Sequence, residues 1–123
     1  MYLRIKRKYD KNNRLIYQLN DTCETIIKRD ENGNIIYKKE WNVSNKDIAY
    51  EFYQEFDYKN RLIHFKDVEN LIEYYIKYDE NDRVILRDFG EGYIKFYYDD
   101  HGNLVKQIYE NGDITEYENI YEW

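Results

Sequence analysis

The 123-residue chain contains no proline, only 5 glycines and a single cysteine, Cys23. One cysteine cannot form an internal disulfide, and we expect its thiol to be a small buried hydrophobe or a chance surface group. Because proline removes a donor from a β-ladder, its absence is compatible with strands along nearly the whole chain. With so few glycines, most turns must be made by asparagine and aspartate.

Long hydrophobic runs are also missing from the chain. No stretch approaches the roughly 18 apolar residues that a membrane span requires. The basic N-terminus, residues 1–8, is not followed by the apolar segment of a signal peptide. These absences predict a cytoplasmic protein that makes no membrane contact.

Charged residues make up 36% of the chain and the mean hydropathy is −1.01, values that are typical of disordered proteins. The 16 tyrosines argue for a folded chain, because tyrosine buries a large ring while its hydroxyl stays in water. The length predicts one domain, residues 1–123. The net charge of −6 disfavours direct binding to nucleic acid and favours a basic protein partner, such as a nucleic-acid-binding effector.

One eight-residue pattern occurs five times: an aromatic residue, Asp, two polar residues, then Asn, Gly or Asp, then Arg or Asn, then two aliphatic residues. The five segments are 9–16, 29–36, 56–63, 78–85 and 98–105. Their aspartates, Asp10, Asp30, Asp57, Asp79 and Asp99, are separated by 20, 27, 22 and 20 residues. Asp can bond backbone amides just ahead of it, and Asn or Gly at position 5 supplies a left-handed conformation cheaply. Each segment therefore predicts the bend of a β-hairpin.

A second set of turn signals lies between these bends, at residues 20–22, 67–70, 90–92 and 110–113. The chain thus predicts about ten short strands, each of roughly 5–8 residues, in an antiparallel meander. We expect this all-β sheet to form a twisted, curled strip or half-barrel. A homodimer is the alternative way of covering its apolar face.

The residues between the second and third bends allow two interpretations. Ser44 can cap a helix in which Ile48, Phe52 and Phe56 recur at helical spacing. The same residues fit the alternation of a strand, and they align with the strand of the following repeat. We expect a long loop at residues 42–47 followed by a strand.

The repeated pattern resembles the YD repeats of RHS (rearrangement hotspot) proteins, whose unit is a Tyr-Asp pair, a polar residue, Gly or Asn, Arg and Leu. The resemblance covers roughly residues 9–118, and the best copies run over 78–99 and 98–117. Arg29 and Phe56 depart from it by replacing the tyrosine. In that family, long arrays form a β-strip that spirals into a shell around a toxin. The resemblance implies the strip for this chain, since five repeats are too few to enclose anything.

Residues suited to catalysis or metal binding are few. We expect His64 to pack in a strand and His101 to take a left-handed turn position. The acidic turns 30–34 and 99–103 resemble the front of a calcium loop but lack the glutamate at its twelfth position. There is no nucleophile elbow, phosphate-binding glycine loop or Cys/His metal pair. We expect no enzymatic activity, no cofactor and no metal.

Alternation along the strands gives the sheet two different faces. One is aliphatic and aromatic, and the other mixes tyrosine with lysine, arginine and glutamate. The mixed face can simply be solvated, but exposed tyrosine is also typical of protein-binding surfaces. The candidate binding residues are Tyr53, Tyr75, Tyr93, Lys95 and Tyr97.

The sequence therefore favours a non-catalytic protein-binding module, either a monomer or a homodimer. Within this class we expect an inhibitor or immunity-type protein of bacterial or phage conflict, similar to an anti-CRISPR protein, that blocks a nucleic-acid-handling target. A structural repeat fragment or self-assembling strip is the first alternative. A carbohydrate-binding module is the second, because exposed aromatic rings stack on sugars.

Overall fold

A computed structural model describes residues 2–122 of the chain as an all-β protein. Its contacts divide the chain into unit 1, residues 1–72, and unit 2, residues 73–123, and each unit is described by itself. No helix in the described part of the chain has the length and hydropathy of a membrane span.

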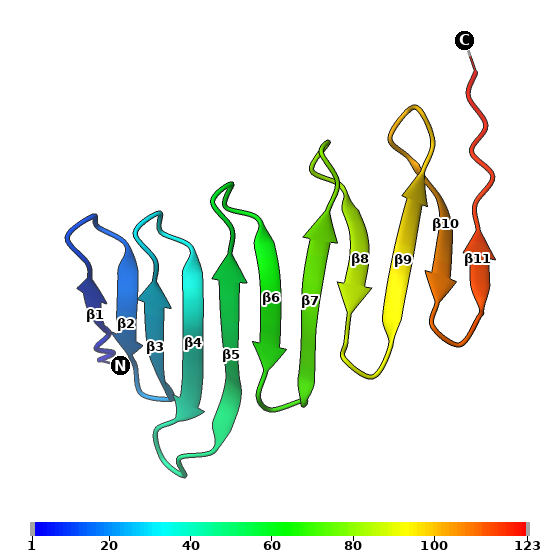
Figure 1. Cartoon of the computed structure of the whole chain (residues 1–123). Coiled ribbons are helices and arrows are strands. Elements are labelled where there is room, and N and C mark those ends of the chain that lie inside the picture. Colours follow the sequence, from blue (N-terminus) through cyan, green and yellow to red (C-terminus); the bar gives the residue numbers. More distant parts are fainter. Residues whose placement is uncertain (1, 123) are drawn as a thin grey trace. The chain divides into compact units, whose positions relative to one another are not determined.

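In unit 1 the chain runs as an antiparallel meander in which each strand pairs with the next one along the sequence (Figure 1). Its strands are β1 (Lys6–Tyr9), β2 (Leu15–Leu19), β3 (Cys23–Arg29), β4 (Ile35–Asn42), β5 (Ile48–Phe56) and β6 (Leu62–Asp67).

Unit 2 repeats this arrangement. Its strands are β7 (Ile72–Tyr78), whose first residue belongs to unit 1, β8 (Val84–Asp88), β9 (Tyr93–Tyr98), β10 (Leu104–Tyr109) and β11 (Ile114–Glu116).

The antiparallel meander predicted from the sequence is confirmed, with eleven strands of 3 to 9 residues in the described chain rather than about ten. The helical interpretation of residues 44–56 is wrong, because residues 42–47 form a turn and β5 follows it. The Asn42 side chain accepts the Ser44 amide, and Lys46 closes the turn with a φ of 67°.

The five aspartates form equivalent bends. In each, Oδ1 accepts the amides of the residues two and four positions ahead, as Asp79 does from Asn81 at 2.8 Å and Arg83 at 3.0 Å. Position 5 is left-handed in all five, at Asn13 (φ 63°), Gly33 (89°), Asn60 (63°), Asp82 (65°) and Gly102 (83°). The strand register shifts by one residue at each bend. This is the hairpin bend that combines a β-turn with a bulge.

The prediction that His101 takes a left-handed backbone conformation is wrong. The next residue, Gly102, takes that conformation, because a glycine has no Cβ to resist it. The His101 ring instead stacks on Tyr121, with ring centroids 4.0 Å apart.

Side chains join each bend to the next segment of chain. In the first, second, fourth and fifth repeats, the carbonyl at position 7, immediately before the register shift, accepts a side-chain hydrogen bond. The pairs are Leu15 with Arg29 Nε, Ile35 with Gln54 Nε2, Val84 with the Tyr98 hydroxyl, and Leu104 with Asn119 Nδ2. Arg29 and Tyr98 both occupy position 1 of their repeats, so Arg29 makes the bond that tyrosine makes elsewhere. Phe56 has no hydroxyl, and Gln54 supplies the donor two residues earlier.

Few side chains are buried in either unit. Among the described residues, the only buried hydrophobic side chains are Ile27 in unit 1, at 7% exposed, and Ile76 in unit 2, at 8%. Thr25 lies on the same face of β3 as Ile27 and is also buried. Each unit is thus a single layer of sheet with limited coverage. The curl expected from the sequence stays a prediction.

Candidate functional site

One face of unit 1 repeats the same three-residue arrangement across successive strands. Lys8 on β1 is the cross-strand partner of Tyr17 on β2, and its ammonium lies 4.9 Å from the Tyr17 ring centroid. The Tyr17 hydroxyl donates to Glu24 on β3 at 2.6 Å. We call this surface the Tyr–Lys face of unit 1. It has the mixture of tyrosine, lysine and glutamate that alternation predicts for one side of the sheet.

Twenty residues further along the chain, the arrangement recurs. Lys28 on β3 lies 5.4 Å from the ring centroid of Tyr37 on β4, and the Tyr37 hydroxyl donates to Glu51 on β5 at 2.7 Å. Burial raises the pKa of Tyr37, and the bond to Glu51 raises it further. The bond to Glu24 likewise raises the pKa of Tyr17. Both rings are therefore held as neutral phenols between a lysine and a carboxylate.

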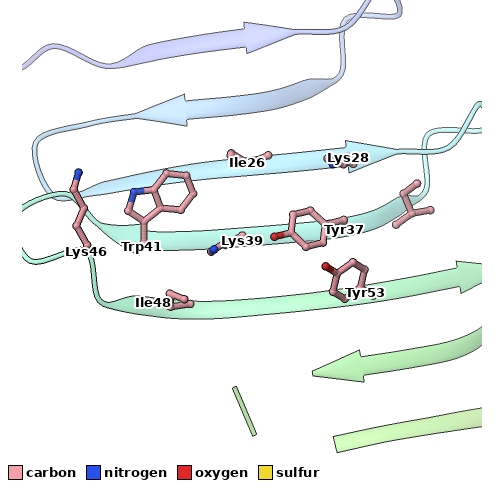
Figure 2. A pocket seen from close by; sticks show the side chains of 9 residues that line it. Ile26, Lys28, Tyr37, Lys39, Trp41, Lys46, Ile48 and Tyr53 are labelled. Atoms are coloured by element: carbon pink, nitrogen blue, oxygen red, sulfur yellow. The ribbon is translucent and has the colours of Figure 1, made fainter. Parts of the chain in front are cut away.

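An open hollow of about 680 Å³ lies on this face, over β3, β4 and β5 (Figure 2). Its lining consists of three isoleucines, three aromatic residues and three lysines. These residues are Ile26, Lys28, Ile36, Tyr37, Lys39, Trp41, Lys46, Ile48 and Tyr53. Tyr37 and Tyr53 are cross-strand partners with ring centroids 4.7 Å apart, and Figure 2 shows them side by side. None of the described residues that line it is an aspartate or a glutamate.

The long turn between β4 and β5 brings the last lysine to the hollow. A register shift at Glu40 and Trp41 sets Trp41 opposite Ile48, and the turn returns Lys46 toward the same end (Figure 2). Lys39, whose side chain shares a face with Trp41, lies with its ammonium 5.9 Å from the Trp41 ring centroid. The residues added between the second and third bends thus contribute one end of the site.

Of the candidate residues predicted from the sequence, Tyr53 lines this hollow. The other four lie together on one face of unit 2. Asp88 on β8 is the cross-strand partner of both Tyr75 on β7 and Tyr93 on β9. Lys95 lies 5.2 Å from the Tyr93 ring centroid. Tyr97, two residues further along β9, is exposed. These four residues form the unit 2 tyrosine patch.

The sequence reasoning missed Tyr37, Lys39, Trp41 and Lys46. The signal for the first three was present, because positions 37, 39 and 41 alternate along one predicted strand and must share a face. Lys46 had no such signal, since its position depends on how the long turn folds.

Charge is divided unevenly between the two units. Unit 1 contains 14 lysines and arginines against 12 aspartates and glutamates, a net charge of +2. Unit 2 contains 5 against 13, a net charge of −8, and together they give the −6 of the whole chain. The acidic character of the protein therefore belongs to unit 2.

The turn acids act on the backbone of their own bends. Asp30 and Asp99 each accept two backbone amides on Oδ1. Oδ2 of Asp99 also accepts bonds from the Tyr121 hydroxyl and from Asn119.

His64, the second histidine of the chain beside His101, lies on β6 with Nδ1 3.1 Å from Glu55 Oε1.

No family model matches the chain, and no curated protein matches it. One similar solved structure is a chain of the Photorhabdus luminescens Tc holotoxin pore, with a TM-score of 0.73 and 15% sequence identity. The match covers 93% of this chain and only 7% of that chain. At this identity the likeness shows the fold alone: the chain has the fold of a short segment of a Tc holotoxin chain.

Proposed function

We propose that the chain is a short array of YD-type repeats that acts as a non-catalytic protein-binding module. The observation that carries this proposal is that each unit is a single sheet layer. Among the described residues, each unit buries one hydrophobic side chain, Ile27 in unit 1 and Ile76 in unit 2. A sheet is normally stabilised by covering one face with a second layer. Here a partner protein supplies that cover.

The unit 2 tyrosine patch is the first contact surface. Tyr75 and Tyr97 are exposed, while Tyr93 is partly covered and lies against Lys95. Tyrosine offers a large contact area with few rotatable bonds, so its burial costs little entropy, and it is enriched where interfaces gain most of their affinity.

The charge of unit 2 favours a basic target. A net charge of −8 attracts a positively charged surface and speeds its encounter. The surfaces of nucleic-acid-handling proteins have this character. An inhibitor or immunity-type protein of bacterial or phage conflict would act by covering such a surface.

The test compares two variants of the full chain. Tyr93→Ala/Tyr97→Ala removes two rings of the patch, whereas Tyr58→Ala removes a ring that is 87% exposed in a bend of unit 1. Partners are captured from bacterial lysate by cross-linking, and the identified partner is then titrated against each variant at low and high salt.

We expect the double variant to bind at least about tenfold more weakly, with an unchanged circular dichroism spectrum. We also expect affinity to fall as salt rises. Equal affinity of the double variant and Tyr58→Ala for the partner would reject the patch. Failure to recover any partner that both the unchanged chain and Tyr58→Ala bind would reject the binding function.

A second candidate is a structural role as one segment of a longer β-strip. The comparison with the Tc holotoxin chain favours it, because nearly all of this chain matches a small fraction of a far larger one. This role predicts oligomers that grow with concentration through strand edges. Light scattering measures this directly, and a constant mass over a hundredfold dilution would exclude it.

A further inference from the structure

We propose that the hollow on unit 1 binds an extended acidic peptide segment of a partner protein, with carboxylates facing the lysines and a large apolar side chain against Trp41 and Ile48. The proposal rests on the protein-binding function and adds the chemistry of the segment that is bound. It concerns a surface separate from the unit 2 tyrosine patch.

The charge of the lining selects an acidic ligand. Lys28, Lys39 and Lys46 line the hollow, and none of them makes an ion pair with a carboxylate in the described chain. Two carboxylates of the same face, Glu24 and Glu51, are already bonded to tyrosine hydroxyls. Two of the lysines lie over aromatic rings, which holds their ammonium groups near the site.

The apolar part of the lining favours a peptide that has a large apolar side chain between its two carboxylates. Ile26, Ile36 and Ile48 line the hollow together with the Trp41 ring. The volume of about 680 Å³ lies within the ~300–1,000 Å³ that is usual for ligand pockets. This space holds a few side chains of an extended segment rather than a folded domain.

The geometry of an extended peptide defines the expected pattern. Every second side chain of a strand faces the same side, at intervals of roughly 6.6 Å. A segment that faces the hollow therefore presents Asp or Glu, then a large apolar residue, then Asp or Glu, at alternate positions.

A peptide fits this lining better than an acidic polysaccharide or a nucleic acid. The three isoleucines offer no hydrogen-bond partner to sugar hydroxyls, and the Tyr37 hydroxyl already donates to Glu51. A long polyanion would also be repelled by the acidic protein as a whole. A short peptide responds mainly to charges within about one Debye length, ~8 Å at physiological salt.

The probe is a fluorescein-labelled peptide with the core Glu-Thr-Leu-Thr-Glu, titrated against the full chain by fluorescence anisotropy. Control peptides carry glutamine in place of both glutamates, or alanine in place of leucine. The triple variant Lys28→Gln/Lys39→Gln/Lys46→Gln removes the lysines of the hollow. The matched variant Lys11→Gln/Lys59→Gln/Lys77→Gln removes the same charge from exposed positions elsewhere.

We expect the glutamate peptide to bind the unchanged chain and the matched variant, and to bind the hollow variant at least about tenfold more weakly. Both control peptides should bind more weakly than the probe. Absence of binding, equal loss in the two triple variants, or equal binding of the glutamine peptide would overturn the proposal.

Two further measurements exclude other occupants. A heparin oligosaccharide that binds through the same lysines and displaces the peptide would assign the site to an acidic sugar. Self-association in analytical ultracentrifugation that only the hollow variant abolishes would assign it to a second copy of the chain. Either result would overturn the proposal. Loss of peptide binding alone, with partner binding through Tyr93 and Tyr97 intact, would leave the proposed function standing.

Discussion

Arg29 donates a hydrogen bond from Nε to the carbonyl oxygen of Leu15 at 3.0 Å, across the junction between the first and second repeats. The Tyr98 hydroxyl makes the equivalent bond to Val84 at 2.6 Å. An arginine and a tyrosine at the same repeat position therefore make the same bond. In the described chain its acceptor belongs to a residue that pairs with the preceding strand but has no ladder partner on the following one. Arg29 also donates to the Gly33 carbonyl in its own bend.

Replacement of Arg29 tests this junction. Arg29→Ala leaves the Leu15 carbonyl without its side-chain donor, and we expect a loss of about 1–3 kcal/mol in the free energy of unfolding. Arg29→Tyr restores a hydroxyl at the position where Tyr98 has one, and should recover most of the loss. Urea denaturation followed by circular dichroism measures both. The junction bond would be unimportant if Arg29→Ala were as stable as the unchanged chain, or if Arg29→Tyr were no better than Arg29→Ala.

A matched pair of glycine substitutions separates backbone strain from side-chain packing. Gly33 and Gly112 both have a left-handed φ, 89° and 95°. A Cβ on Gly33 would lie 2.7 Å from the Arg14 guanidinium carbon, whereas a Cβ on Gly112 would meet nothing within 4 Å. We expect Gly112→Ala to cost about 1–2 kcal/mol and Gly33→Ala to cost more.

The difference between the stability losses of Gly33→Ala and Gly112→Ala measures the contact of Arg14 with the second bend. Arg14→Ala in the Gly33→Ala background should remove the excess, as thermal melts of the single and double variants will show. Equal destabilisation by the two alanines would mean that Arg14 moves aside freely.

The five bend aspartates predict sensitivity to acid. Backbone bonds from Arg14 and Arg83 are the largest causes that lower the pKa of Asp10 and Asp79. At Asp99 the largest cause is the Tyr121 hydroxyl, and at Asp30 and Asp57 the hydrogen bonds outweigh an opposing effect of burial. A carboxyl whose pKa is lowered by folding stabilises the fold above its unfolded pKa, about 3.9. That contribution is lost as the pH falls through the folded pKa.

We therefore expect a melting temperature that is nearly constant from pH 7 to 5 and falls steeply below about pH 4. Asp79→Asn should lower stability at pH 7 and flatten the acid decline, because one titrating bend is gone. Asp21→Asn, at an aspartate in a different turn, serves as the control. An acid decline in Asp79→Asn as steep as in the control would contradict the role of the bend carboxyl.

The segment after β11 is held on the fifth bend by side chains. Tyr121 donates to Asp99 and accepts from Asn103 Nδ2, and Asn119 donates to the Leu104 carbonyl. We expect Tyr121→Ala to raise amide hydrogen exchange in residues 117–122 severalfold and to raise the pKa of Asp99. Ile120→Ala, at an exposed position, should leave the exchange unchanged. Unchanged exchange in Tyr121→Ala would show that the backbone alone holds the segment.

The sequence predicted the features that are set by neighbours in the chain. Asp at position 2 and Asn, Gly or Asp at position 5 determine each bend locally. The left-handed position was predicted where Asn or Gly stands at position 5, but not for Asp82, and it was wrongly expected for His101. The alternation of residues predicted that Tyr93, Lys95 and Tyr97 share a face. It did not predict the hollow, because Trp41 and Lys46 meet only through a register shift and a six-residue turn. The bond from Gln54 to Ile35 was also beyond local reasoning, since it depends on which strand end lies beside the bulge.

The self-sufficiency of the aspartate bends affects how such a protein can change in length. Each aspartate accepts backbone amides that lie no more than four residues ahead of it. A duplicated segment of about twenty residues therefore contains everything that its bend needs. Only one further group must be supplied, a donor that reaches the preceding carbonyl, and arginine, glutamine, tyrosine and asparagine all serve. Duplication of a hairpin is therefore tolerated with little adjustment of sequence, and wide divergence between copies leaves the architecture intact.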